Sequence, residues 1–238
     1  MPLQPDSRRF VLTAALLVLA TGLAVVAAGQ SPGTPAPDPR RFEADIAAFE
    51  AEDRATPPPR NAVLFVGSSS IRYWDLAKAF PGRSAIKRGF GGSHVSDSIY
   101  YADRIIVRYQ PALIVFYAGD ADVAAGKTSA QIAADYRALI ALIHGRLPNA
   151  RTIVIGTKHS PAHWAHLDVI RKANASAAAL AAGDDLVDYV DLESALLGTD
   201  GLPRADYYAE NGLNLNERGY AAWTAAVAPV IEQYWPKP

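Results

Sequence analysis

Cysteine is absent from the 238 residues of this chain. The absence excludes a disulfide framework, a metal site built on thiolates and lipidation of an N-terminal cysteine. A large excess of one charge is also absent, because the formal net charge is −1 and the basic residues do not gather in one stretch. Nucleic-acid-binding domains usually carry a basic patch, so nucleic acid is not an expected partner.

Apolar residues make up 50% of the chain. Beyond residue 60 there are few clusters of glycine or proline, and no internal repeat is evident. A chain of this length and composition can bury a substantial core. We therefore expect one globular domain over residues 42–238.

The N-terminus has the pattern of an export signal. Ser7-Arg8-Arg9 precedes an uncharged stretch at residues 11–28 that ends in small residues. This pattern predicts a signal peptide over residues 1–28, and the alternative is an N-terminal membrane anchor that keeps the segment in contact with the membrane. Both alternatives place the domain outside the cytoplasm, either periplasmic or secreted. Residues 29–41 are rich in proline and predict a linker.

Short apolar segments alternate with segments of helical spacing along the rest of the chain. Strands are predicted at residues 62–66, 84–88, 112–117, 152–155 and 186–190. Helices are predicted at residues 71–80, 95–109, 129–147, 164–182 and 217–234, after a short first helix that buries Phe42, Ile46 and Phe49. Such alternation is typical of a parallel sheet covered by helices on both faces.

The stretch Ala62–Trp74 is the strongest local signal. Five apolar residues run into Gly67 and three serines, as a buried parallel strand does when it delivers a side chain to its carboxyl end. Ligands bind beyond the strand ends in open α/β sheets. Ser69 is therefore a candidate nucleophile, and the alternative is that the serines only cap the following helix.

Four blocks of sequence together resemble the SGNH hydrolases, also called GDSL esterases and lipases. These blocks are VGSSSI, RGFGGS, YAGDAD and ENGLNLNERGY, and the longer stretch FEAEDRATPPPRNAVLFVGSSSIRYW is similar to a subgroup of exported bacterial members. The resemblance implies a three-layer α/β/α sandwich with about five parallel strands in flavodoxin-like order. It also implies ester hydrolysis by a serine, without a metal or another cofactor.

The resemblance assigns a role to five positions. Ser69 falls at the nucleophile and Gly92 at a backbone donor of the oxyanion hole. The third oxyanion donor, an asparagine in the family, is Ala121 here, and the orienting aspartate and the basic histidine are Asn211 and Asn214. A methyl group donates no hydrogen bond, and a carboxamide is not a base near pH 7. We therefore expect a degenerate domain that binds an acyl or carbohydrate-ester-like small molecule and hydrolyses it poorly.

Two alternatives remain open. In the first, the protein is an active esterase in which another group takes the proton of Ser69; the candidates are His94, His159, His163, Asp120 and Glu210. A carboxylate would need a raised pKa for that role. Asp122 is instead expected to be structural, hydrogen-bonding loop amides. In the second, the domain binds a protein partner at the cell envelope. The asparagines can also be the result of deliberate inactivation.

Overall fold

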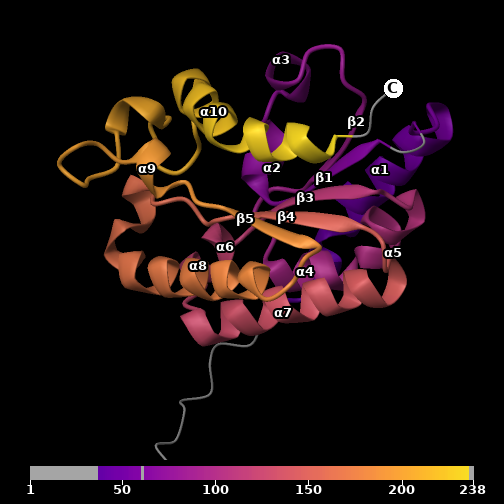
Figure 1. Cartoon of the computed structure of the whole chain (residues 1–238), viewed down its shortest axis with the longest axis horizontal. Coiled ribbons are helices and arrows are strands. Elements are labelled where there is room, and N and C mark those ends of the chain that lie inside the picture. Colours follow the sequence, from indigo (N-terminus) through magenta and orange to yellow (C-terminus); the bar gives the residue numbers. More distant parts are fainter. Residues whose placement is uncertain (1–36, 60–61, 236–238) are drawn as a thin grey trace, which may run out of the picture. The chain divides into compact units, whose positions relative to one another are not determined.

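The computed structural model of this chain describes residues 37–59 and 62–235. Its centre is a sheet of parallel strands in the order β2-β1-β3-β4-β5 (Figure 1). The strands are β1 (Val63–Gly67), β2 (Ala85–Gly89), β3 (Leu113–Tyr117), β4 (Arg151–Ile155) and β5 (Val187–Val190). The predicted flavodoxin-like order is confirmed, and every predicted strand is present to within one residue at each end.

Helices cover both faces of this sheet. In Figure 1, α7 (Ser129–Arg146) and α8 (Leu167–Ala182) lie along one face, and α10 (Glu217–Tyr234) lies along the other. Alternate residues of β1 enter two separate apolar clusters, Leu64 and Val66 the first, and Val63 and Phe65 the second. The period of two between successive side chains therefore divides the core into two layers, one under each set of helices.

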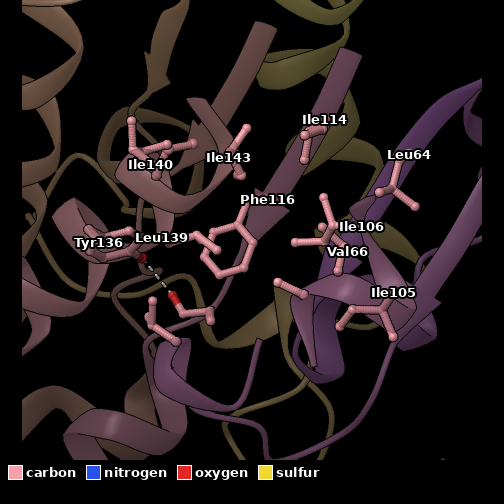
Figure 2. Packing of buried hydrophobic residues seen from close by; sticks show 14 of the residues in the cluster. Leu64, Val66, Ile105, Ile106, Ile114, Phe116, Tyr136, Leu139, Ile140 and Ile143 are labelled. Atoms are coloured by element: carbon pink, nitrogen blue, oxygen red, sulfur yellow. Dashed lines mark hydrogen bonds between the residues drawn. The ribbon is translucent and has the colours of Figure 1, made fainter. Parts of the chain in front are cut away.

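The first cluster includes buried residues from α1 (Glu43–Ala55), α4 (Val95–Tyr100), α5 (Ala102–Ile105), α7 and α8. Figure 2 shows part of its packing, in which Phe116 of β3 lies against Leu139 and Tyr136 of α7. The Tyr136 hydroxyl donates a hydrogen bond of 2.9 Å to the carbonyl oxygen of Ala118. Because Ala118 directly follows β3, this bond attaches α7 to the edge of the sheet where the strands end.

Two predicted helices are divided in the structure. In place of one helix at 71–80, the structure has α2 (Ser69–Tyr73) and α3 (Leu76–Ala79). The Asp75 side chain accepts a hydrogen bond from the Lys78 amide at 3.0 Å and so caps the start of α3. The segment 95–109 contains α4, α5 and the 3-10 helix η2 (Val107–Tyr109). The single helices predicted there are therefore wrong, whereas α10 begins and ends where predicted.

The predicted signal peptide or anchor lies outside the described residues, as does most of the predicted linker. The last residues of that linker belong to the 3-10 helix η1 (Pro39–Phe42), in which Phe42 is buried. Within residues 37–59 and 62–235, no helix combines the length and the apolar character that crossing a membrane requires.

Candidate functional site

The turn after β1 presents one serine and buries two. Gly67 has φ +138°, and a Cβ added there would lie 1.9 Å from the carbonyl oxygen of Tyr117. Only glycine therefore lets the chain pass this close to β3. The Ser68 amide donates to the same Tyr117 oxygen at 2.9 Å. Ser68 and Ser70 are buried and Ser69 is partly exposed, so Ser69 is the hydroxyl available to a ligand.

Four of the five predicted site residues line one pocket of about 410 Å³. They are Ser69, Gly92, Ala121 and Asn214, and other lining residues include Arg72, Tyr73, Asp120 and His163. Asn211, the fifth, does not line this pocket and is exposed. Its side-chain oxygen accepts hydrogen bonds from the amides of Leu213 and Asn214, each at 3.0 Å. Asn211 thus shapes the turn that carries Asn214.

Gly92 contributes backbone to the pocket in a conformation that favours glycine. Its φ is +79°, and an added Cβ would meet no heavy atom within 4 Å. Space is therefore available beside Gly92, and the need for glycine comes from the backbone conformation rather than from crowding.

Ala121 and Asp122 lie in the first turn of α6 (Asp120–Ala124). The methyl group of Ala121 reaches the pocket but offers no donor. Asp122 is fully buried, and its carboxylate accepts from the Val95 amide at 3.1 Å and from Lys127 Nζ at 2.7 Å. The prediction that Asp122 is structural is confirmed.

A buried ion pair lies beside the pocket. Lys158 follows β4, is 0% exposed and donates to Asp120 Oδ2 at 2.6 Å. The same carboxylate oxygen accepts from the Tyr117 hydroxyl at 2.7 Å, and Lys158 Nζ also donates to Ser70 Oγ at 3.2 Å. This network joins the ends of β3 and β4 to the helix that begins at the nucleophile position. Sequence analysis missed Lys158, although a lysine three residues after a buried strand was a usable signal.

The pair keeps Asp120 ionised. Burial acts to raise the pKa of this carboxyl group, but the charge of Lys158, with polar contacts from His163, Lys158 and Tyr117, outweighs burial and lowers the pKa from 3.8 to about 2. A carboxylate held this firmly in its charged form is a poor proton acceptor. Asp120 is therefore unsuited to the role of general base that sequence analysis left open for it.

The three histidines considered as substitute bases lie in different surroundings. His163 lines the Ser69 pocket, and its Nδ1 lies 3.7 Å from Asp120 Oδ1. His94 is buried with its Nδ1 3.8 Å from Asp122 Oδ1, and burial lowers its pKa against the opposing charge of Asp122. His159 is buried and lines a separate pocket of about 340 Å³. Of the three, only His163 shares the pocket with Ser69.

Comparison with known proteins identifies relatives of this fold. The sequence pattern of the family described as GDSL-like Lipase/Acylhydrolase matches residues 66–222. A solved structure from Streptococcus pneumonia aligns with TM-score 0.71 and 17% identity over 81% of this chain and 93% of the other. None of the curated proteins matches the chain.

Two further structures show the same fold at low identity. A GDSL-like lipase from Bacteroides thetaiotaomicron aligns with TM-score 0.67 and 19% identity over 80% of this chain and 98% of the other. An acetyl-xylooligosaccharide esterase from Geobacillus aligns with TM-score 0.59 and 12% identity over 75% of this chain and 98% of the other.

Breaking the buried ion pair from either side is expected to destabilise the domain. Asp120→Asn leaves Lys158 as a lone buried charge, and Lys158→Met leaves Asp120 as one, so each should lower the free energy of unfolding by about 3–5 kcal/mol. The double variant removes both charges and should cost less than either single change. Urea unfolding of the four proteins measures this, and single effects that simply add would contradict it.

Acidification should remove the stabilisation that Asp120 supplies. The pKa of Asp120 in the folded protein, about 2, lies below its ordinary value of 3.8. Its contribution to the free energy of unfolding is therefore complete above pH 4 and lost as the pH falls toward 2, on the order of 2 kcal/mol in total. Across this range, the free energy of unfolding of the Asp120→Asn, Lys158→Met variant should change less with pH than that of the natural protein. Equal slopes for the two proteins would count against this assignment.

Proposed function

Because this chain belongs to the GDSL-like lipase/acylhydrolase family, we propose that it is a degenerate ester hydrolase, which binds an acyl or carbohydrate-ester-like ligand beside Ser69. One observation carries this proposal: a single pocket contains the nucleophile and backbone-donor positions of the family together with two of the three altered positions. The altered residues in that pocket are Ala121 and Asn214.

The altered residues remove most of the family's chemistry and leave its binding surface. Asn214 cannot accept the proton of Ser69, and the loss of a triad base costs on the order of 10⁴–10⁶ in turnover. Ala121 supplies no donor to an oxyanion, which costs roughly 10²–10³. Although these losses do not add, each alone makes hydrolysis by the family's own relay very slow.

The ligand class is supported by the pocket and by one relative. Tyr73 lines the pocket and is 56% exposed, and Arg72, whose Nη1 donates to Asp45 Oδ1 at 3.4 Å, lines it as well. An exposed aromatic ring beside hydrogen-bond donors suits a sugar ring that carries an ester. The Geobacillus relative is named for the hydrolysis of an acetylated xylooligosaccharide, which belongs to this ligand class.

We also propose that the domain acts outside the cytoplasm, in the periplasm or as a secreted protein. The uncharged stretch after Arg8 and Arg9 supports this proposal. Retention of that stretch as an anchor would keep the pocket near the membrane surface. Failure of the domain to bind any ester would instead favour the alternative that it binds a protein partner at the cell envelope.

Restoring the family residues should restore hydrolysis. The variant Ala121→Asn, Asn211→Asp, Asn214→His replaces the donor, the orienting carboxylate and the base without touching Ser69. We expect it to hydrolyse p-nitrophenyl acetate at least about 10³-fold faster than the natural sequence, because a triad base alone is worth more than that. Adding Ser69→Ala to this variant is the control and should abolish the gain. A triple variant that folds but stays inactive would show that the positions are assigned wrongly.

Enlarging Gly92 should block the ligand, and its cost in backbone strain should match that of the same change at a glycine outside the pocket. Acetylated xylooligosaccharide at 100 times its dissociation constant should stabilise the natural protein by about 2.7 kcal/mol in thermal unfolding. Gly92→Val places a side chain in the open space of the pocket and should abolish that stabilisation. Gly201→Val is the matched control, since Gly201 has φ +75° and equally open surroundings but lies outside the pocket. Retained binding by Gly92→Val would contradict the proposed site.

A further inference from the structure

The pocket contains an imidazole and a carboxylate that the family's relay does not use. His163 lies in the 3-10 helix η3 (Pro161–His166) and is 8% exposed, and Asp120 begins α6. Nδ1 of His163 faces Oδ1 of Asp120 at 3.7 Å. Neither of these two buried atoms has a hydrogen-bond partner among the residues that the structure describes. Each atom is therefore free to pair with the other after a small movement of the ring.

The backbone places His163 beside the position where the family carries its base. The Ala162 amide donates to the Gly212 carbonyl oxygen at 3.1 Å, so η3 lies against the turn that carries Asn214. A Cβ on Gly212 would lie 3.3 Å from Cβ of Pro161, which confirms how closely the two segments approach. His163, Asn214 and Ser69 line the same pocket.

The carboxylate of Asp120 is prepared to orient this imidazole. Its Oδ2 is occupied by Lys158 and Tyr117, and these contacts fix the carboxylate and keep it ionised. Only Oδ1 remains for His163. With Nδ1 directed to Asp120, the other ring nitrogen, Nε2, is left for the pocket. An ionised carboxylate on one nitrogen and a free second nitrogen are what a histidine needs to act as a general base.

We propose that His163 is a catalytic base for Ser69, that Asp120 is its positioning residue, and that the protein retains slow ester hydrolysis by this second route. The inference rests on the proposed function for the class of ligand, an ester bound beside Ser69. It adds a proton acceptor to a pocket whose family base has become Asn214. The Ser69 hydroxyl makes no side-chain hydrogen bond within residues 37–59 and 62–235, and the proposed route takes its proton to His163 after a side-chain rotation or through one water molecule.

The reaction balances with water as the only other reactant. His163 Nε2 takes the proton of Ser69 as Oγ bonds to the ester carbon and the carbonyl oxygen becomes an oxyanion. The carbon–oxygen bond to the alcohol then breaks, and the proton on His163 passes to the departing alcohol. Water attacks the acylated Ser69 with His163 again as base, and the acid leaves as Ser69 regains its proton. No electrons are exchanged with a cofactor.

The other candidates for the base are less suitable. Lys158 is held as an ion pair by Asp120 and donates to Ser70, so its proton is already committed. His94 and His159 do not line the pocket, and neither does the exposed Glu210. Slow turnover is expected even with His163 in place, because Ala121 still leaves the oxyanion without its third donor.

The test compares His163→Asn with His166→Asn, a matched control in the same 3-10 helix that is exposed and outside the pocket. Hydrolysis of p-nitrophenyl acetate is measured with Ser69→Ala as the baseline, together with the rate at which a fluorophosphonate labels Ser69. We expect the natural protein to exceed the baseline in both measurements. His163→Asn should remove that excess, at least about 10²-fold in labelling rate, and His166→Asn should not change it.

The same change in the restored triple variant separates a base from a structural residue. There Asn214→His supplies the base, so His163→Asn should lower the rate by a much smaller factor than it does in the natural protein. The double variant Asp120→Asn, Lys158→Met, which leaves no lone buried charge, should likewise lower the rate in the natural pocket more than in the restored one. Equal losses in both pockets would overturn the assignment of His163 and Asp120 as base and positioning residue.

The outcomes also separate this inference from the proposed function. If the natural protein does not exceed the Ser69→Ala baseline while the restored variant is active, the second route is wrong and the degenerate ester-binding pocket stands. If the restored variant is inactive and acetylated xylooligosaccharide does not bind, the proposed function itself fails. A natural rate equal to that of the restored variant would contradict the degenerate state.

Discussion

The ion pair between Asp120 and Lys158 is the interaction on which the site depends. It connects the start of α6 to the end of β4, and through Tyr117 and Ser70 it reaches β3 and the nucleophile turn. Lys158 is 0% and Asp120 3% exposed, so each charge depends mainly on the other for its stabilisation. The pair therefore fixes the relative positions of three strand ends, whatever chemistry the loops above them carry.

Neutral side chains are sufficient to hold the C-terminal loop that carries Asn211 and Asn214. Asn211 keeps the acceptor oxygen that its turn needs, since one carboxamide oxygen serves the amides of Leu213 and Asn214. Asn216 caps α10 by accepting from the Gly219 amide at 3.0 Å. The hydrogen bonds that hold the C-terminal loop are thus made by neutral side chains. If Asn211 stands at the orienting position, as proposed, the absence of a charge there affects chemistry and not the structure of the turn.

The parts of the site that sequence could predict are those governed by short-range rules. The apolar run that ends at Gly67 predicts a strand and an exposed Ser69, and parallel strand ends bring the Gly92 and Ala121 turns to the same edge. Asn211 and Asn214 were placed in the site by resemblance alone. Asn214 lines the pocket, whereas the side chain of Asn211 is directed to its own turn.

The parts that sequence could not predict depend on distant pairings. Lys158 and Asp120 are 38 positions apart, and only folding brings them together, so neither the ion pair nor the lowered pKa of Asp120 follows from local pattern. Likewise, only the fold shows that His163 lines the Ser69 pocket and that His94 and His159 do not. The break before Asp75 was missed because an aspartate inside a helical pattern reveals its capping role only when the backbone turns.

Binding and hydrolysis in this pocket draw on different groups. A bound ester presents oxygens that accept hydrogen bonds, and Ser69, Arg72 and the carboxamide of Asn214 can all donate to them. Hydrolysis needs the opposite, a site that takes a proton from Ser69. Under the proposed second route the imidazole of His163 is that acceptor, because Asp120 is held in its charged form by Lys158. Affinity for an ester would then persist without His163, whereas turnover would be lost.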